Sequence, residues 1–294
     1  MVEITVQGLT PNGAPNHRKI ALRNDIHIAV DNPAQHVTTR LERSENLRSR
    51  IVPQHLTALK RDQSFCFTCS PTVPCFNACC RDLNQILTPY DILCLKHHLA
   101  MTSTEFLSTY TETNIGPGSG LPVVSLRFGD ADDLACPFVT SKGCRVYPAR
   151  PASCRTYPLA RGVARNRETG TVTEHWALIQ ESHCRGFAEG TSQTVDQWVQ
   201  DQQIAEHNRM NDLMLELIYT KNRFRPGPLK PDEQRLVYAA LYDLDAVCFD
   251  PATGPGIPNI RGHGRSHDRT LTDDAEHLVR AMAHLRDIVF SAGT

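Results

Sequence analysis

Apolar side chains in the last third of the chain recur at the spacing of amphipathic helices. Three stripes follow the 3.6-residue period: Met210, Leu213, Met214, Leu217 and Ile218; then Val237, Leu241, Leu244 and Cys248; then Leu278, Met282, Leu285 and Val289. Thr272 stands where the N-cap of the third helix is expected. The pattern predicts a helical C-terminal region over residues 191–294, in which Cys248 is a core residue.

Two shorter helices are predicted upstream, because capping signals accompany the apolar pattern. Thr88 suits the N-cap position and Pro89 suits the first helical position, so we expect a helix from Pro89 to Leu99. Thr102 and Glu105 have the spacing of a capping box, in which each residue bonds the backbone N–H of the other. This pair predicts a second short helix.

Strand patterns lie between these helices and the C-terminal region. Residues 122–128 are rich in β-branched side chains and predict a strand. Residues 158–166 and 171–179 flank a turn at Gly170 and predict a β-hairpin. A small antiparallel sheet is therefore expected in this part of the chain.

The combined pattern predicts an α+β protein. We expect a loop-rich domain with a small antiparallel sheet, packed against a helical region. Its predicted segments are a peripheral N-terminal arm at 1–62, a cysteine-bearing domain at 63–190 and the helical region at 191–294.

The charge balance excludes several classes of partner. The chain has 31 lysines and arginines against 32 acids, a formal net charge of −1, so no global field attracts nucleic acid or an anionic membrane. No run of apolar residues approaches the roughly 18 needed to span a bilayer. The first residues do not resemble a secretory signal. We expect a cytoplasmic protein with no nucleic-acid or membrane partner.

Cysteine is the outlier in composition, with 11 residues, and all but Cys94 and Cys248 fall into two groups. The first group is Cys66, Cys69, Cys75, Cys79 and Cys80, and the second is Cys136, Cys144, Cys154 and Cys184. The odd count and the expected reducing compartment argue against a disulfide framework. Metal binding is the better interpretation of the nine clustered thiols.

The spacing of the cysteines supports a shared inorganic centre. A two-residue gap lets the thiolates of Cys66 and Cys69 reach one ion, and a hairpin turning at Gly143 brings Cys136 towards Cys144. Between the first cysteine and Cys154 the only histidines are adjacent, at 97 and 98, so the site is essentially all thiolate. Such donors favour zinc or an iron-sulfur cluster over calcium, magnesium or a non-haem iron triad.

Arginines accompany the cysteines closely along the chain. Four of them are candidate cofactor-binding residues: Arg81, Arg145, Arg150 and Arg155. Four thiolates around zinc or a 4Fe-4S core leave a net charge of about −2, which guanidinium groups would offset. Arginine N–H groups aimed at sulfur would also raise the potential of a redox cluster.

Several ordered motifs carry a family resemblance over about residues 63–190. They are Cys66-x-x-Cys69, Cys75-Phe-Asn-Ala-Cys79-Cys80-Arg81, Leu87-Thr88-Pro89-Tyr90-Asp91, Cys136-Pro-Phe, Gly143-Cys144-x-Val-Tyr147 and Arg150-Pro151-x-x-Cys154-Arg155-x-Tyr157-Pro158. They resemble the bacterial YkgJ-type cysteine-cluster family, described as a zinc- or iron-chelating CxxCxxCC domain and as Fe-S-cluster-containing. The gap from Cys69 to Cys75 is longer than the compact spacing of that family.

Three functions are compatible with the sequence. The leading hypothesis is an iron-sulfur protein, with a 4Fe-4S cluster, a redox or cluster-assisted role and an unidentified protein or redox partner. A structural zinc module that acts as an adaptor is the alternative. The resemblance to a domain of flagellin lysine N-methylase implies a third, a protein-lysine N-methyltransferase. No catalytic residue is assigned.

Overall fold

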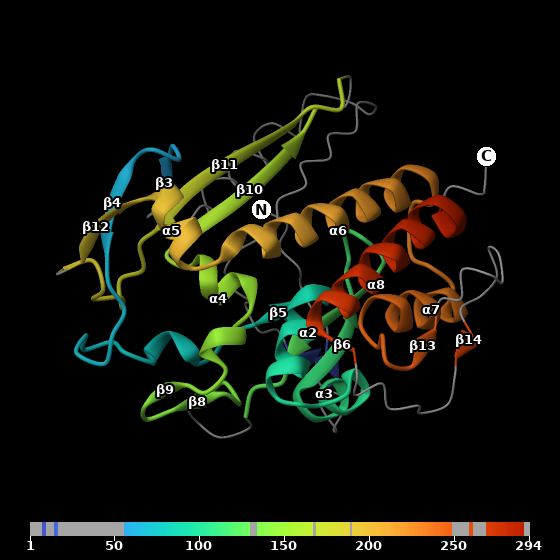
Figure 1. Cartoon of the computed structure of the whole chain (residues 1–294), viewed down its shortest axis with the longest axis horizontal. Helices are drawn as coiled ribbons and strands as arrows, with labels where there is room; N and C mark the ends of the chain where they lie inside the picture. The colour runs from blue at the N-terminus through green and yellow to red at the C-terminus, as the bar shows by residue number, and fades with distance from the viewer. Residues whose placement is uncertain are drawn as a thin grey trace. The chain divides into compact units, whose positions relative to one another are not determined.

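The computed structural model describes residues 8–9, 15–16, 56–129, 134–166, 169–188, 190–248, 259–260 and 269–290. The chain divides into two compact units that alternate along the sequence (Figure 1). Unit 1 comprises Met1–Phe76 and Thr156–Gln202, and unit 2 comprises Asn77–Arg155 and Gln203–Thr294. The α+β class and the helical C-terminal region are confirmed. No helix among the described residues is long and apolar enough to cross a membrane.

Unit 1 contains a three-stranded antiparallel sheet in the order β10-β11-β3. Strands β10 (Leu159–Arg165) and β11 (Val172–Ile179) form the hairpin that the sequence predicts, with Gly170 in the left-handed region at its turn. Strand β3 (Leu56–Leu59) pairs with β11, so these residues of the predicted peripheral arm belong to the sheet. Apart from 8–9, 15–16 and 56–62, that arm lies outside the described residues.

A second pair of strands in unit 1 carries the first cysteine. Strand β4 (Ser64–Phe67) pairs antiparallel with β12 (Thr191–Thr194), which leads into α5 (Val195–Asp201) through a Thr194 capping box. Alternation along β4 buries Phe65 and Phe67 and leaves Cys66 exposed. A two-stranded pair, β1 (Gly8–Leu9) with β2 (Pro15–Asn16), completes the elements of this unit.

Unit 2 begins with the 3-10 helix η1 (Ala78–Cys80), followed by strand β5 (Ile86–Leu87). The helices α2 (Pro89–His98) and α3 (Ser103–Tyr110) both start with the predicted threonine caps, and both capping boxes are complete. Strands β6 (Thr111–Ile115) and β7 (Pro122–Leu126) join β5 in a sheet of order β5-β7-β6. The predicted helices and strand are thus confirmed, with ends that differ by a few residues.

A loop-rich stretch of unit 2 carries the second group of cysteines. It contains the hairpin β8 (Val139–Thr140) and β9 (Gly143–Cys144), then the 3-10 helix η2 (Tyr147–Ala149) and the short helix α4 (Ala152–Thr156). Gly143 occupies the turn with φ of 112°, a conformation that favours glycine. The predicted hairpin is confirmed.

Two of the C-terminal helices of unit 2, α6 and α8, pack against α2, and the third, α7, packs against α8 and β7. They are α6 (Ile204–Phe224), α7 (Pro231–Leu241) and α8 (Leu271–His284), continued by a π-helical turn at Leu285–Phe290. Buried side chains such as Met210, Leu217, Val237 and Leu278 share one core with α2 and β7. The N-cap of α8 is Thr270 rather than the predicted Thr272.

The second predicted stripe is not one continuous helix. Helix α7 ends at Leu241, and Cys248 lies on the two-residue strand β13 (Val247–Cys248), which pairs with β14 (Asn259–Ile260). The carboxylate of Asp243 accepts hydrogen bonds from the hydroxyls of Ser103 and Thr104, at 2.7 and 2.8 Å. These contacts with α3 hold the chain out of the helical path. The side chain of Cys248 lies outside the described residues.

Candidate metal centre

The clustered cysteines separate into one group in each unit. None of the ten described cysteines forms a disulfide. We call Cys79, Cys80, Cys136, Cys144 and Cys154, all in unit 2, the five-thiol group. We call Cys66, Cys69, Cys75 and Cys184, all in unit 1, the four-thiol group. The two groups cut across the order in which the cysteines occur along the sequence.

Backbone pairing brings the five-thiol group together from separate segments. Cys79 and Cys80 belong to η1, and the carbonyl of Cys80 accepts the backbone N–H of Cys136 at 2.9 Å. The hairpin pairs Val139 with Cys144, while the Val139 N–H donates to the carbonyl of Cys136 at 3.1 Å. A 3-10 helix, a hairpin and the backbone hydrogen bonds between them therefore position four of the five thiols.

The thiols of this group interact with one another. A side-chain hydrogen bond with Cys79, followed by burial, raises the pKa of the Cys80 thiol, and Cys154 and Cys136 act in the same direction. Burial raises the pKa of Cys136, and the neighbouring Cys144 adds to the effect. Cys154 keeps a solvent-exposed edge, yet desolvation by surrounding protein and the charges of Cys136 and Cys144 raise its pKa to about 12. Effects of this kind place each of the five thiols within electrostatic range of at least one other member of the group.

Two of the predicted arginines lie within charge range of these thiols. The guanidinium of Arg150 stacks on Tyr147 at 3.8 Å, and its charge lowers the pKa of Cys144 against the larger effect of burial. Arg145 donates to the hydroxyl of Tyr110 at 2.9 Å and acts on Cys136 and Cys144 in the same way. Positive charge is thus fixed beside the group by aromatic contacts.

The other two predicted arginines are placed differently. Arg155 is buried and donates to the carbonyls of Arg150 and Pro148, and its charge acts on Cys94. Arg81 forms an isolated β-bridge with Ala135, and its side chain is exposed. A cofactor-binding role for either arginine stays a prediction.

Sequence reasoning missed Gln85, which touches the five-thiol group. Its side-chain oxygen accepts from the Cys154 thiol at 3.6 Å, and its amide nitrogen donates to Ser153 at 2.5 Å. Gln85 is buried at the edge of β5 and is 69 residues from Cys154 in the sequence. No spacing rule could have linked these two positions.

The four-thiol group in unit 1 is formed by strand β4, the loop that follows it and the loop around Cys184. The backbone N–H of Arg185 donates to the sulfur of Cys75 at 3.1 Å, and the thiols of Cys75 and Cys184 are hydrogen-bonded. The N–H of Thr68 donates to the carbonyl of Gly186 at 2.9 Å. A side chain at Gly186 would place its Cβ only 2.5 Å from the carbonyl oxygen of Thr68, so the close approach requires glycine there. Cys66 and Cys69 flank this junction and are exposed.

The thiol donors of both groups suit a thiophilic metal. In neither group do the side chains already have the arrangement that encloses an ion. Among the described residues, no three donor side chains of cysteine, histidine, aspartate or glutamate converge closely enough to hold a metal. Free thiols on loops and short helices can close further by side-chain rotation, because metal binding and local ordering are coupled. Zinc and iron-sulfur centres both accept all-thiolate ligand sets.

Cys94 is separate from both groups. It lies on the buried face of α2, with 9% of its surface exposed, and is hydrogen-bonded to Tyr90. Burial raises its pKa to about 12. It belongs to the core of unit 2, and none of the clustered thiols is among the groups that shift its pKa.

Comparison with known proteins identifies the family of this segment. Residues 68–185 match the family model named CxxCxxCC, described as "Putative zinc- or iron-chelating domain". The match confirms the resemblance to the cysteine-cluster family and supports metal binding as the property of the segment. It contains eight of the nine clustered cysteines and begins two residues after Cys66. No curated protein and no solved structure matches the chain.

Proposed function

We propose that the chain is an iron-sulfur protein whose cluster, of the 4Fe-4S type, is bound by the five-thiol group of unit 2. The observation that carries the proposal is that backbone hydrogen bonds and a hairpin join three of the four segments of unit 2 that carry these thiols, none of which forms a disulfide. A 4Fe-4S cluster takes four thiolates. The cluster would supply one-electron transfer, which makes a redox role the simplest function.

The surroundings of the five thiols support a redox centre. Arg145 and Arg150 offer the positive charge that a cluster with four thiolates requires. Tyr110, Tyr147 and Phe138 hold these two guanidinium groups in place. Charge and hydrogen bonds near the sulfur atoms are the means by which proteins raise cluster potentials.

A structural zinc ion on the four-thiol group is the second candidate. Cys66, Cys69, Cys75 and Cys184 supply the four thiolates of a closed tetrahedral site, and Cys75 accepts a backbone N–H that would stabilise a bound thiolate. The loops around them have few regular elements, so an ion would contribute folding free energy.

Anaerobic purification tests the iron-sulfur proposal against zinc alone. We expect a brown protein with broad visible absorption that contains iron and acid-labile sulfide. A colourless protein with stoichiometric zinc and no sulfide would refute the cluster.

A further inference from the structure

A cavity of about 350 Å³ in unit 2 is lined by polar side chains that the metal proposal does not use. Helix α2 contributes Tyr90, Cys94, His97 and His98, and the first residues of α6 contribute Glu206 and His207. Among its described lining residues, none is a member of the five-thiol or four-thiol group. The volume is within the range of small-molecule sites.

The register of α2 explains why its polar groups converge on the cavity. Tyr90, Cys94 and His97 are spaced by four and three residues, so they share one face of the helix. Glu206 and His207 occupy the first turn of α6, which packs against α2. Polar and titratable side chains of α2 and α6 therefore line the same cavity.

His207 is held in a defined orientation by Asp91. Its Nδ1 lies 3.1 Å from Oδ1 of Asp91, and only 4% of the His207 side chain and 1% of the Asp91 side chain are exposed. The carboxylate of Asp91 also accepts the backbone N–H groups of Thr88 and Ala152, at 2.9 and 2.8 Å. Because a carboxylate only accepts, Nδ1 of His207 carries a proton, and in the neutral imidazole Nε2 is then the acceptor. Nε2 has no hydrogen-bond partner within the described residues.

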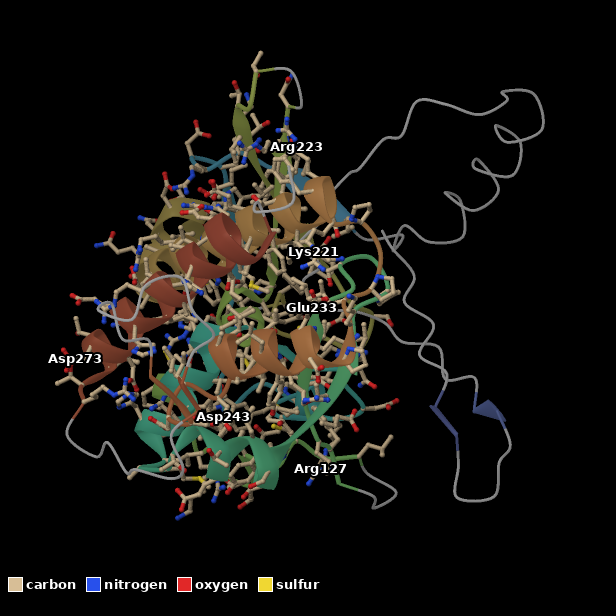
Figure 2. All side chains as sticks on the ribbon, turned by 90° about the vertical axis from the view of Figure 1, so that its right-hand side faces the viewer. Arg127, Lys221, Arg223, Glu233, Asp243 and Asp273 are labelled. Carbon is tan, nitrogen blue, oxygen red and sulfur yellow. The ribbon has the colours of Figure 1, made fainter. Side chains whose placement is uncertain are left out.

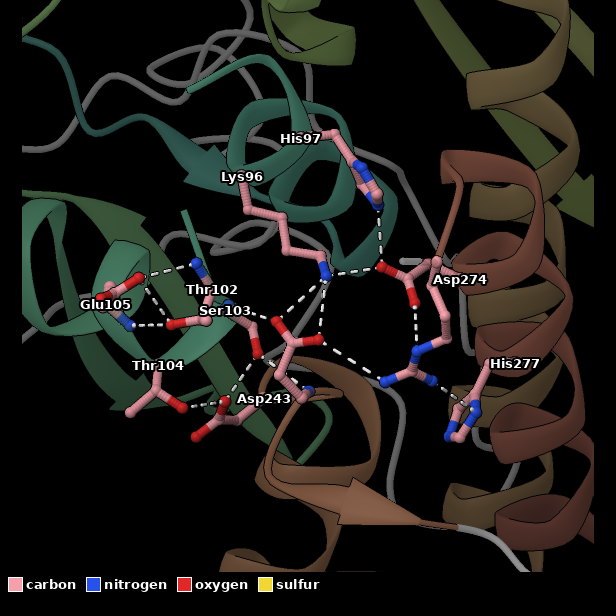
Figure 3. A network of polar contacts seen from close by, with 11 residues as sticks. Lys96, His97, Thr102, Ser103, Thr104, Glu105, Asp243, Asp274 and His277 are labelled. Carbon is pink, nitrogen blue, oxygen red and sulfur yellow. Dashed lines mark hydrogen bonds and ion pairs between the residues drawn. The ribbon is translucent and has the colours of Figure 1, made fainter. Parts of the chain in front are cut away.

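His97 is fixed in a similar way on the opposite helix. Its Nε2 lies 2.8 Å from Asp274, a buried carboxylate that also pairs with Lys96 at 2.5 Å and with Arg269 at 3.3 Å (Figure 3). This network fixes the His97 ring at the cavity wall. Two imidazoles of one cavity are thus each oriented by a carboxylate, as is common for histidines that contact ligands.

One buried positive charge lies in the cavity wall. It is the guanidinium of Arg155, held by bonds to the carbonyls of Arg150 and Pro148. The only carboxylate among the described lining residues is that of Glu206, which is half exposed and paired with Arg209 at 2.6 Å. An anionic group would be favoured beside Arg155, where water is largely excluded.

We propose that this cavity binds a small hydroxylated organic anion, with its anionic group beside Arg155 and its hydroxyl donating to Nε2 of His207. None of the clustered thiols lines this cavity or takes part in the hydrogen bonds named above.

Two dicarboxylates that differ by one hydroxyl test the assignment in the wild-type chain. Isothermal titration of malate and succinate should give a dissociation constant about five-fold lower for malate, the worth of one hydrogen bond to a buried acceptor. Glycerol 3-phosphate, which carries a hydroxyl and a phosphate, identifies which anionic group is preferred. Tighter binding of malate than of succinate supports the site, and equal binding of malate and succinate, or no binding of any probe, overturns it.

A histidine variant and a matched control assign the hydroxyl contact. His207→Gln keeps a donor for Asp91 and removes the Nε2 acceptor, so it should abolish the preference for malate. His175→Gln, at an exposed position of β11, should leave the preference intact. If His207→Gln does not fold, imidazole nitrogen shifts in the wild-type chain decide: malate should move the resonances of His207 and His97 but not that of His175. Unmoved His207 resonances at saturating malate would refute the proposal.

Discussion

Cys94 and Cys154 of unit 2 have similar thiol pKa values but different surroundings. The residues around each thiol, rather than its pKa, distinguish a candidate metal ligand from a core residue. The pKa of Cys94 and that of Cys154 are both raised to about 12, with burial as the main cause. Cys154, however, lies within charge range of Cys136 and Cys144, whereas Cys94 is hydrogen-bonded to Tyr90 in the apolar core. A metal needs several converging thiolates, so only Cys154 is placed to contribute to a centre.

This difference predicts opposite outcomes for the same substitution. Cys154→Ser should lower the iron and sulfide content of the anaerobically purified chain, because it removes a thiolate from the five-thiol group. Cys94→Ser should leave the content unchanged while lowering the free energy of unfolding by about 1 kcal/mol through an added buried hydroxyl. Analysis of iron and sulfide per chain measures the loss of the cluster, and denaturant unfolding measures the loss of stability. Equal metal content in both variants would remove Cys154 from the ligand set.

Residue types and spacings predict the cysteine chemistry but not the contacts around it. The match over residues 68–185 confirms the resemblance of this segment to the cysteine-cluster family, which local motifs had indicated. The Asp91–His207 pair joins residues 116 positions apart, and neither lies in a motif for such a pair. Long-range pairs depend on helix packing, which a single sequence does not encode in any short pattern.

At the scale of elements, the turn after α6 depends on one close approach of two loops. Lys221, near the end of α6, is fully buried and donates to the carbonyl of Gly227, in the turn that leads to α7 and Glu233 (Figure 2). Gly120 has φ of +66°, and a Cβ there would lie 2.6 Å from the Gly227 oxygen and 2.8 Å from Nζ of Lys221. Glycine is required at this position for both conformation and space.

Gly120→Ala should therefore lower the free energy of unfolding by about 2 kcal/mol or more, from strain and overlap combined. Gly118→Ala is the matched control, because its Cβ would meet nothing within 4 Å. We expect that variant to stay within about 0.5 kcal/mol of the wild type in denaturant unfolding. Equal stability of the two variants would contradict this description of the turn.

Helix α8 contributes an acid-sensitive group, His277. Burial, reinforced by the charges of Arg269 and Arg280, lowers its pKa from 6.5 to about 4. The unfolded chain then takes up the proton first, so stability is lost as the pH falls from about 6.5 towards 4. The loss amounts to about 3 kcal/mol, from about 1.4 kcal/mol for each pKa unit.

Urea unfolding at pH 7 and at pH 4.5 measures this contribution. His277→Gln should lose less stability than the wild type between these two values, because the titrating group is gone. His175→Gln, at an exposed site, should follow the wild type. A wild-type loss that His277→Gln does not reduce would show that other groups cause the acid sensitivity.

Capping motifs explain why the starts of α2 and α3 could be predicted from the sequence. The boxes at Thr88 and Thr102 are confirmed because both partners lie within three residues of each other. The end of α7 was not predictable, because Asp243 and Asp245 leave the helical path to bond Ser103, more than 130 residues away. The apolar period continued through Leu244 and gave no sign of this tertiary contact.

At the scale of the whole molecule, the two units divide the cysteines in a way that their order along the chain does not suggest. Cys75 belongs with Cys184, 109 positions later, whereas Cys79 belongs with the later group in unit 2. Pairing of β4 with β12 joins the distant segments of unit 1. The α+β class was predictable from local periods, but this long-range pairing was not.

Metal removal should affect stability as well as colour. An iron chelator with reductant should lower the thermal unfolding midpoint under anaerobic conditions, because the loops that carry the thiols order around the bound centre. Circular dichroism on holo and stripped protein measures the change. An identical midpoint in the two forms would mean that the centre does not contribute to folding.

We propose that clustered thiolates of this chain bind an iron-sulfur cluster. X-ray absorption at the iron edge of the anaerobically purified chain tests it most directly, since it reads the ligand atoms and any neighbouring iron. We expect a first shell of sulfur and a second shell of iron around each iron atom. Iron surrounded by oxygen or nitrogen, or a protein that contains only zinc, would contradict it.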